Sequence, residues 1–147
     1  DTLAFRQLGH DVVAMDASIE MVNATRSYAG EPVFHSTFMV FSTDLEFDGI
    51  WACASLLHVP RSELSATLRH LSHMLKDSGA IFASFKIGQT EQVRNGRFFN
   101  DMTEEQFRDY THSVKGLCVK SVWKTTDARP DRNERWLNAI LQKQPGS

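Results

Sequence analysis

The sequence predicts an α/β fold with a mostly parallel sheet, helices on both faces and an antiparallel pair of strands at the C-terminal end. Three observations predict it. Segments with helical spacing alternate with short apolar runs, Asp16 closes one such run just before a helical pattern, and a short link joins the last two apolar segments. Strands flanked by helices pair in parallel through right-handed crossovers, whereas strands joined by a short link pair antiparallel.

The N-terminal part predicts a helix, a strand, a second helix and a second strand. Leu3, Ala4 and Leu8 share one face of the first helix, and Gly9 is placed for a left-handed cap. A buried strand is predicted over residues 11–16, a helix over 19–28 ended by Gly30 and Pro32, and a short strand over 33–38.

The middle of the chain predicts a buried strand over residues 48–55 and then a helix that Pro60 and Ser62 open. The apolar stripe of this helix consists of Leu64, Leu68, Leu71 and Leu75. Residues 77–79 predict a turn, because they combine an aspartate, a serine and a glycine. A further strand follows over residues 80–85.

The C-terminal part begins with residues 88–100, which are polar and contain glycine and so predict a loop. Thr103 and Gln106 predict a capping box at the start of a helix, with Met102 and Phe107 as its hydrophobic staple. Strands are predicted over 117–125 and 135–141, with a loop over 127–134. We expect one domain over residues 1–143 and a tail over 144–147.

Composition excludes several classes of protein. The 147 residues are 41% hydrophobic and 23% charged, with a formal net charge of -2, so nothing indicates nucleic acid as a partner. No apolar stretch is long enough to span a bilayer, and we expect no membrane partner. Cys53 and Cys118 lie in apolar segments without metal-ligand spacing, so we expect buried free thiols, no metal and a cytoplasmic location.

Asp16 is the most informative single residue. An acidic side chain at the carboxyl end of a parallel strand is where α/β folds hold the hydroxyl groups of a ribose. The simpler interpretation is that Asp16 and Ser18 cap the helix that follows. Both interpretations stay open from position alone.

Four stretches together resemble the class I S-adenosylmethionine-dependent methyltransferases of the type 11 kind, which act on small molecules. They are residues 9–22, 47–60, 75–86 and the terminal strand pair that ends at 136–141. The resemblance implies a Rossmann-like fold and S-adenosylmethionine as cofactor. It also implies cofactor contacts from Asp16, Ala17 and Ser18.

The resemblance also implies site residues at the ends of later strands. Where the family often has an acidic residue near adenine, this sequence has Thr37 and Phe38; Phe38 would stack on adenine or belong to the core. Ala54 and Ser55 would let the cofactor approach the backbone. The remaining candidates are His58, for substrate contact or proton acceptance, and Lys86 and Arg97, to hold an anionic substrate. Their simpler interpretations are a loop histidine bonded to backbone and two solvated cations.

One feature of the family is missing from residues 1–147. The glycine-rich turn after the first strand does not occur in them, and the first strand would precede Asp1. We therefore expect these residues alone to bind the cofactor weakly and to be inactive or weakly active, since the turn supplies backbone amides for its carboxylate. An absent central strand would also expose sheet edges, which predicts a homodimer, or closure of the second strand against the fourth in a monomer.

Two other functions compete with methyl transfer to a small acceptor. One is a truncated homologue that no longer catalyses and serves as an oligomeric or binding module. The other is a nicotinamide-dependent oxidoreductase, which also places an acidic residue after its second strand. The antiparallel terminal pair and residues 57–60 argue against the oxidoreductase.

Overall fold

The computed structural model describes residues 1–131 and 133–145. The chain divides into two compact units, Asp1–Ser42 and Thr43–Ser147. The expectation of one domain over residues 1–143 is not decided by this division and stays a prediction. Gln144 is tied to the second unit by its N–H, which donates to the Gly116 carbonyl at 2.8 Å, whereas Gly146 and Ser147 of the predicted tail lie outside the described residues.

The first unit holds two helices and a two-stranded parallel sheet. Its elements are α1 (Thr2–Gln7), β1 (Ala14–Asp16), α2 (Ile19–Ala29) and β2 (Val33–His35). Gly9 has a φ of +93°, as its predicted left-handed cap requires. Arg6 joins the elements, because its guanidinium donates to the carbonyls of Ala29 at 2.7 Å and Val12 at 2.9 Å.

Both strands of this unit are shorter than predicted. Residues 11–13 do not join the ladder, and the Val12 carbonyl accepts a hydrogen bond from Arg6. Beyond His35 the chain turns, because the Phe41 N–H donates to the Thr37 carbonyl at 3.0 Å. The register pairs Asp16 with His35, so the carboxyl ends of β1 and β2 are side by side.

The second unit contains a four-stranded sheet with strand order β3-β4-β8-β7. The elements are β3 (Phe47–Ala52), the 3-10 helix η1 (Leu56–His58), α3 (Arg61–His73), β4 (Leu75–Lys86), β5 (Glu91–Arg94), β6 (Arg97–Asn100), α4 (Glu104–His112), β7 (Leu117–Thr126) and β8 (Arg135–Lys143). β3 and β4 are parallel, whereas β8 pairs antiparallel with both β4 and β7. The predicted antiparallel C-terminal pair is confirmed. Within this sheet, however, β3 and β4 form the parallel pair and the other two pairs are antiparallel, whereas the prediction was a mostly parallel sheet.

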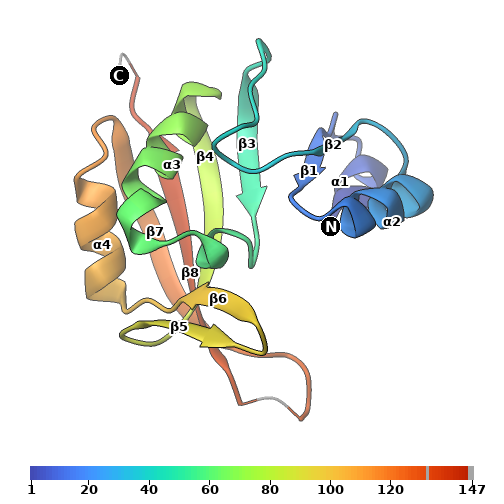
Figure 1. The fold of residues 1–147 in the computed structure, drawn as a ribbon. Coiled ribbons are helices and arrows are strands. Elements are labelled where there is room, and N and C mark those ends of the chain that lie inside the picture. Colours follow the sequence, from blue (N-terminus) through green and yellow to red (C-terminus); the bar gives the residue numbers. More distant parts are fainter. Residues whose placement is uncertain (132, 146–147) are drawn as a thin grey trace. The chain divides into compact units, whose positions relative to one another are not determined.

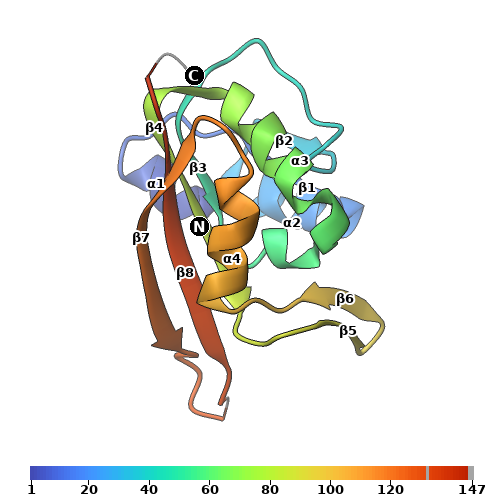
Figure 2. The ribbon, with the colours of Figure 1, turned by 90° about the vertical axis from the view of Figure 1, so that its left-hand side faces the viewer.

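In this unit α3 and α4 lie on the same face of the sheet (Figures 1 and 2). The residues that fill the space between them and the sheet are fully or almost fully buried: Leu64, Leu68, Leu71, Ile81, Ala83, Phe85, Phe107, Leu137, Ala139 and Leu141. Burial alternates along β4 over residues 79–83, because side chains in a strand point to opposite faces in turn. The opposite face carries a row of aromatic side chains. Trp51 stacks on Phe82 with 4.1 Å between their ring centroids, and the ring centroids of Phe82 and Trp123 are 6.0 Å apart.

The predicted capping box of α4 is confirmed. The Thr103 hydroxyl accepts from the Gln106 N–H at 3.2 Å, and the Gln106 side chain accepts from the Thr103 N–H at 3.1 Å. Met102 and Phe107, the predicted staple, are both fully buried. Local sequence therefore fixes where this helix begins.

Three predictions about local structure differ from the structure. Residues 77–79 do not separate two elements but form an irregularity within β4, where Ser78 has a φ of 66° and the register shifts between Phe47 and Gly49. Residues 88–100 are not a loop, because β5 and β6 pair as an antiparallel hairpin. The strand predicted over 48–55 ends at Ala52, where the chain turns into η1.

The cysteines differ from the expectation of buried thiols. Both are free, but Cys53 is exposed and Cys118 is half-buried. Cys53 lies just after the end of β3, and Cys118 lies on the edge strand β7, so neither side chain is enclosed by the sheet. Among the described residues, no helix is long and apolar enough to cross a membrane.

Candidate active site

Asp16 lies at the carboxyl end of β1 and holds the turn into α2. Its Oδ1 accepts from the Ser18 N–H at 2.9 Å, and the Ser18 hydroxyl caps α2 by accepting from the Met21 N–H at 3.4 Å. The structure therefore confirms that Asp16 and Ser18 cap α2, and the ribose interpretation of Asp16 stays open. The cap leaves the Asp16 Oδ2 atom with no hydrogen-bond partner among the described residues, so this half-buried carboxylate still has an acceptor available.

Hydrogen bonds also hold the residues near Asp16 at the ends of β1 and β2. His35 Nε2 lies 2.9 Å from the Ala17 carbonyl, which ties the end of β2 to the turn after β1. Thr37 is exposed, and its hydroxyl accepts from the Val40 N–H at 3.4 Å. Phe38 is half-buried, so its two interpretations, adenine contact and core, stay open.

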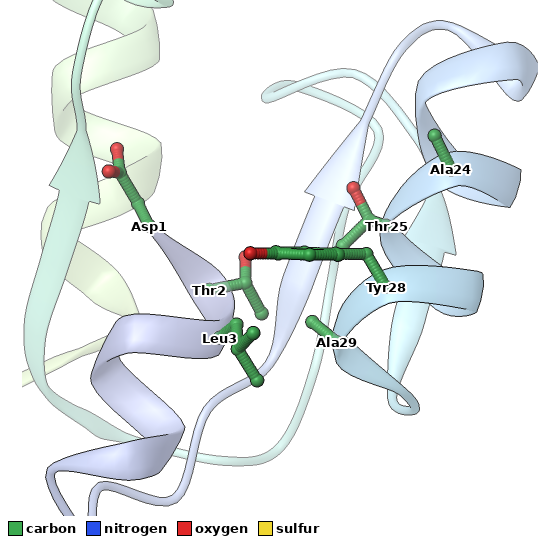
Figure 3. A pocket seen from close by; sticks show the side chains of 7 residues that line it. All are labelled: Asp1, Thr2, Leu3, Ala24, Thr25, Tyr28 and Ala29. Carbon is green, nitrogen blue, oxygen red and sulfur yellow. The ribbon is translucent and has the colours of Figure 1, made fainter.

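A pocket of about 250 Å³ is also present in the first unit, but it lies elsewhere (Figure 3). Its lining comes from α1, the N-cap residue before it and α2: Asp1, Thr2, Leu3, Ala24, Thr25, Tyr28 and Ala29. The Tyr28 ring reaches from α2 toward Thr2 of α1 (Figure 3). None of the predicted site residues lines this pocket, because they follow the strand ends rather than the helix surfaces.

In the second unit, Ala54 and Ser55 form the turn after β3. Ala54 has a φ of 50°, an uncommon conformation for a residue with a side chain. The turn is held from β4, because the Ala54 N–H donates to the hydroxyl of buried Ser84 at 2.7 Å. Ser84 was not among the predicted site residues, although a serine among apolar residues of a buried strand calls for a partner.

His58 is held firmly at the end of η1. The two residues before it, Leu56 and Leu57, are buried and anchor the turn. Its Nδ1 lies 2.7 Å from the Phe98 carbonyl oxygen, and its ring centroid lies 4.9 Å from that of Phe99. The predicted backbone contact of a loop histidine is therefore present, and it fixes the ring at one edge of the β5–β6 hairpin.

The structure brings Arg97 to His58. One guanidinium nitrogen of Arg97, Nη2, lies 2.9 Å from His58 Nε2. Lys86 reaches the same group of residues through Phe99, since its Nζ lies 4.6 Å from the Phe99 ring centroid. Lys86 also pairs with Glu134 at 3.2 Å, so its charge is already balanced within the protein.

The β5–β6 hairpin positions this cluster, and the sequence interpretation missed it. Its turn is Asn95-Gly96, with φ values of 51° and 75°, and this dipeptide between two strands is a strong hairpin signal. The hairpin is fixed by Arg94, which pairs with the buried carboxylate of Asp101. The hydrogen bond to Asp101 raises the pKa of Arg94, so the guanidinium stays charged.

Comparisons with known proteins give the same fold. The model of a family described as a methyltransferase domain matches residues 1–83. A 1,6-didemethyltoxoflavin N1-methyltransferase from Burkholderia thailandensis, solved with S-adenosylhomocysteine, has a TM-score of 0.80 at 16% identity. A magnesium protoporphyrin IX methyltransferase from Synechocystis, also with bound S-adenosylhomocysteine, has a TM-score of 0.76 at 16% identity.

The alignments cover 97% of this chain and 65% of the Burkholderia chain, or 68% of the Synechocystis chain. A third similar structure is a cyclase, with a TM-score of 0.70 at 14% identity over 96% of this chain and 71% of that chain. A search of curated proteins gave no match. At these identities the solved structures show the α/β fold that the sequence predicts, and the cyclase shows that the fold supports more than one reaction.

Proposed function

Because the chain belongs to the methyltransferase domain family, we propose that it serves methyl transfer from S-adenosylmethionine to a small-molecule acceptor. The observation that carries this proposal is the Asp16 carboxylate at the carboxyl end of β1, which keeps one oxygen available. The S-adenosylhomocysteine in the similar methyltransferases supports the choice of cofactor.

The residues present fit the nucleoside half of such a cofactor. Asp16 Oδ2 would accept from the ribose hydroxyls, and Ala17 and Ser18 would lie along the adenosine. In the first unit, Thr37 and Phe38 follow β2 and would approach the adenine. In the second unit, taken by itself, Ala54 and Ser55 offer a backbone without bulky side chains after β3. When bound, the cofactor supplies a sulfonium methyl group, and transfer depends mostly on how the acceptor is positioned.

For the acceptor we propose an anionic small molecule. Arg97 is exposed, and no carboxylate pairs with it among the described residues, so it is the cation available for direct contact. Lys86 is balanced by Glu134, and its contribution is to hold Phe99 in place. His58 would orient the acceptor and take up its proton.

The alternative is a non-catalytic homologue that serves as an oligomeric or binding module. The family match favours the methyltransferase over this alternative and over a nicotinamide-dependent oxidoreductase. Weak cofactor binding by residues 1–147 stays a prediction, which rests on the absence of a glycine-rich turn in them.

Asp16→Ala is expected to weaken binding of S-adenosylhomocysteine by about 1.5–3 kcal/mol, or about 10- to 150-fold, because the ribose loses hydrogen bonds to a charged group. Isothermal titration calorimetry measures the change. Glu20→Ala is the matched control, because it removes an exposed carboxylate from the first turn of α2 and leaves Asp16 in place. If the affinity of Asp16→Ala equals that of the wild type, Asp16 is only part of the helix cap and the proposed cofactor site is wrong.

We also propose that the chain forms a homodimer in the cytoplasm. β3 is an edge strand of its sheet, and it carries the half-exposed Trp51 on a face that α3 and α4 do not cover. Edge strands recruit partner strands, and free thiols at Cys53 and Cys118 suit a reducing compartment. Light scattering at micromolar concentration is expected to give twice 16.7 kDa, and a clean monomer mass would contradict the dimer.

A further inference from the structure

The hydrogen bonds of His58 define its tautomer. The Phe98 carbonyl oxygen can only accept, so Nδ1 of His58 carries the proton and donates to it at 2.7 Å. A guanidinium can only donate, so Nε2 of His58 accepts from Arg97 at 2.9 Å. The lone pair that would take up a proton is therefore occupied.

Arg97 differs from the neighbouring cations in its partner. Lys86 pairs with Glu134, and Arg94 pairs with Asp101. Arg97 donates instead to a neutral imidazole, and it lies exposed at the start of β6, directly after the Asn95-Gly96 turn. A carboxylate would compete well for this guanidinium, because it brings an opposite charge that the neutral imidazole lacks, and its two oxygens match the fork of donors.

The two partners also differ in how firmly they are held. His58 is fixed by the Phe98 carbonyl, by the adjacent Phe99 ring and by the buried Leu57 before it. Arg97 has an exposed side chain on a short hairpin. If their contact breaks, the arginine moves and the imidazole keeps its place and its tautomer.

We propose that Arg97 covers the Nε2 lone pair of His58 until an acceptor with a carboxylate group draws the guanidinium away. This inference rests on the proposed function, and it makes His58 available as a base only when an anionic acceptor is present. The acceptor's nitrogen or oxygen then forms the new bond to the methyl carbon and gives its proton to Nε2. The electron pair of the broken sulfur–carbon bond stays on the sulfur.

The test follows the ¹⁵N resonance of His58 Nε2 at about pH 8, above the range where an ordinary histidine titrates. Benzoate is titrated to about 50 mM, because a single exposed ion pair binds weakly, and benzamide is its neutral control. The variants are Arg97→Ala and Arg97→Gln, with Arg108→Ala as a matched control that removes an exposed cation from α4.

Arg97→Ala is expected to move the Nε2 resonance, since the nitrogen loses its donor, and Arg108→Ala is expected to leave it unchanged. In the wild type, benzoate should move the resonance toward its position in Arg97→Ala, while benzamide should not. In both Arg97 variants, benzoate and benzamide should have the same effect on the Nε2 resonance.

An unchanged Nε2 resonance in Arg97→Ala, or equal responses of the wild type to benzoate and benzamide, would overturn the inference. The experiment contains no cofactor, so its failure is separate from failure of the proposed function. The latter would appear as unchanged binding of S-adenosylhomocysteine by Asp16→Ala.

Discussion

Phe107→Ala is expected to lower the free energy of unfolding of the second unit by about 3–5 kcal/mol. Phe107 is fully buried on α4, and its ring centroid lies 5.7 Å from that of Phe85 in β4. Truncation removes the contact between helix and sheet and leaves a cavity that the surrounding strands cannot fill. Urea denaturation followed by circular dichroism measures the loss, which is a large part of the 5–15 kcal/mol typical of a domain.

Val93→Ala is a suitable control for this variant. Val93 is 70% exposed on β5, so its truncation should change the stability by no more than about 0.5 kcal/mol. Phe107→Leu should fall between the two, because it keeps part of the buried volume. A Phe107→Ala variant as stable as Val93→Ala would show that α4 does not pack on the sheet as described.

Arg61→Ala is expected to cost about 2–4 kcal/mol, because one guanidinium serves several acceptors at once. Its Nε donates to the side chain of Asn100 at 2.9 Å, and its Nη2 donates to the Asp101 carbonyl at 2.6 Å and the Gln106 side chain at 3.0 Å. Asn100 and Asp101 are almost fully buried, so the variant leaves acceptors without water or partner.

Arg69→Ala is the matched control, since Arg69 lies on the same helix and is exposed. Arg61→Lys should recover only part of the loss, because an ammonium group lacks the planar set of donors. The same urea denaturation compares all three variants. If Arg61→Ala and Arg69→Ala unfold at the same urea concentration, the contacts of Arg61 contribute nothing to stability.

Where the determinants are local, the sequence predicts the structure well. The α/β class follows from the alternation of periodic segments, and the capping box at Thr103 sets the start of α4. Asp16 and Ser18 were assigned to the end of a strand and the start of a helix, and the structure places them there.

Where the determinants come from distant residues, the sequence gives little. The first N–H of α3, at Arg61, is satisfied by the carboxylate of Glu91 at 3.0 Å, and no helix-capping rule based on neighbours finds a partner 30 residues away. Residues 77–79 have the composition of a turn, yet β4 continues through them. Gly79 is needed there, because a Cβ would lie 3.1 Å from the Asp48 carbonyl oxygen of the adjacent strand.

For the candidate site, residue types were easier to predict than their pairing. His58 and Arg97 were each singled out, but their contact depends on the β5–β6 hairpin, in which β5 is mostly exposed and neither strand has an apolar alternation. The Asn95-Gly96 turn was the available signal. The buried Ser84, which holds Ala54, is recognisable only when both strands are placed.

The positions of the aromatic residues make the two units optically distinguishable. All three tryptophans, Trp51, Trp123 and Trp136, belong to the second unit, whereas the first has Tyr28. Tryptophan emission therefore reports on the second unit alone, while circular dichroism records the helices of both. Coincident transitions by the two probes would indicate a single cooperative domain, and separated transitions would indicate two.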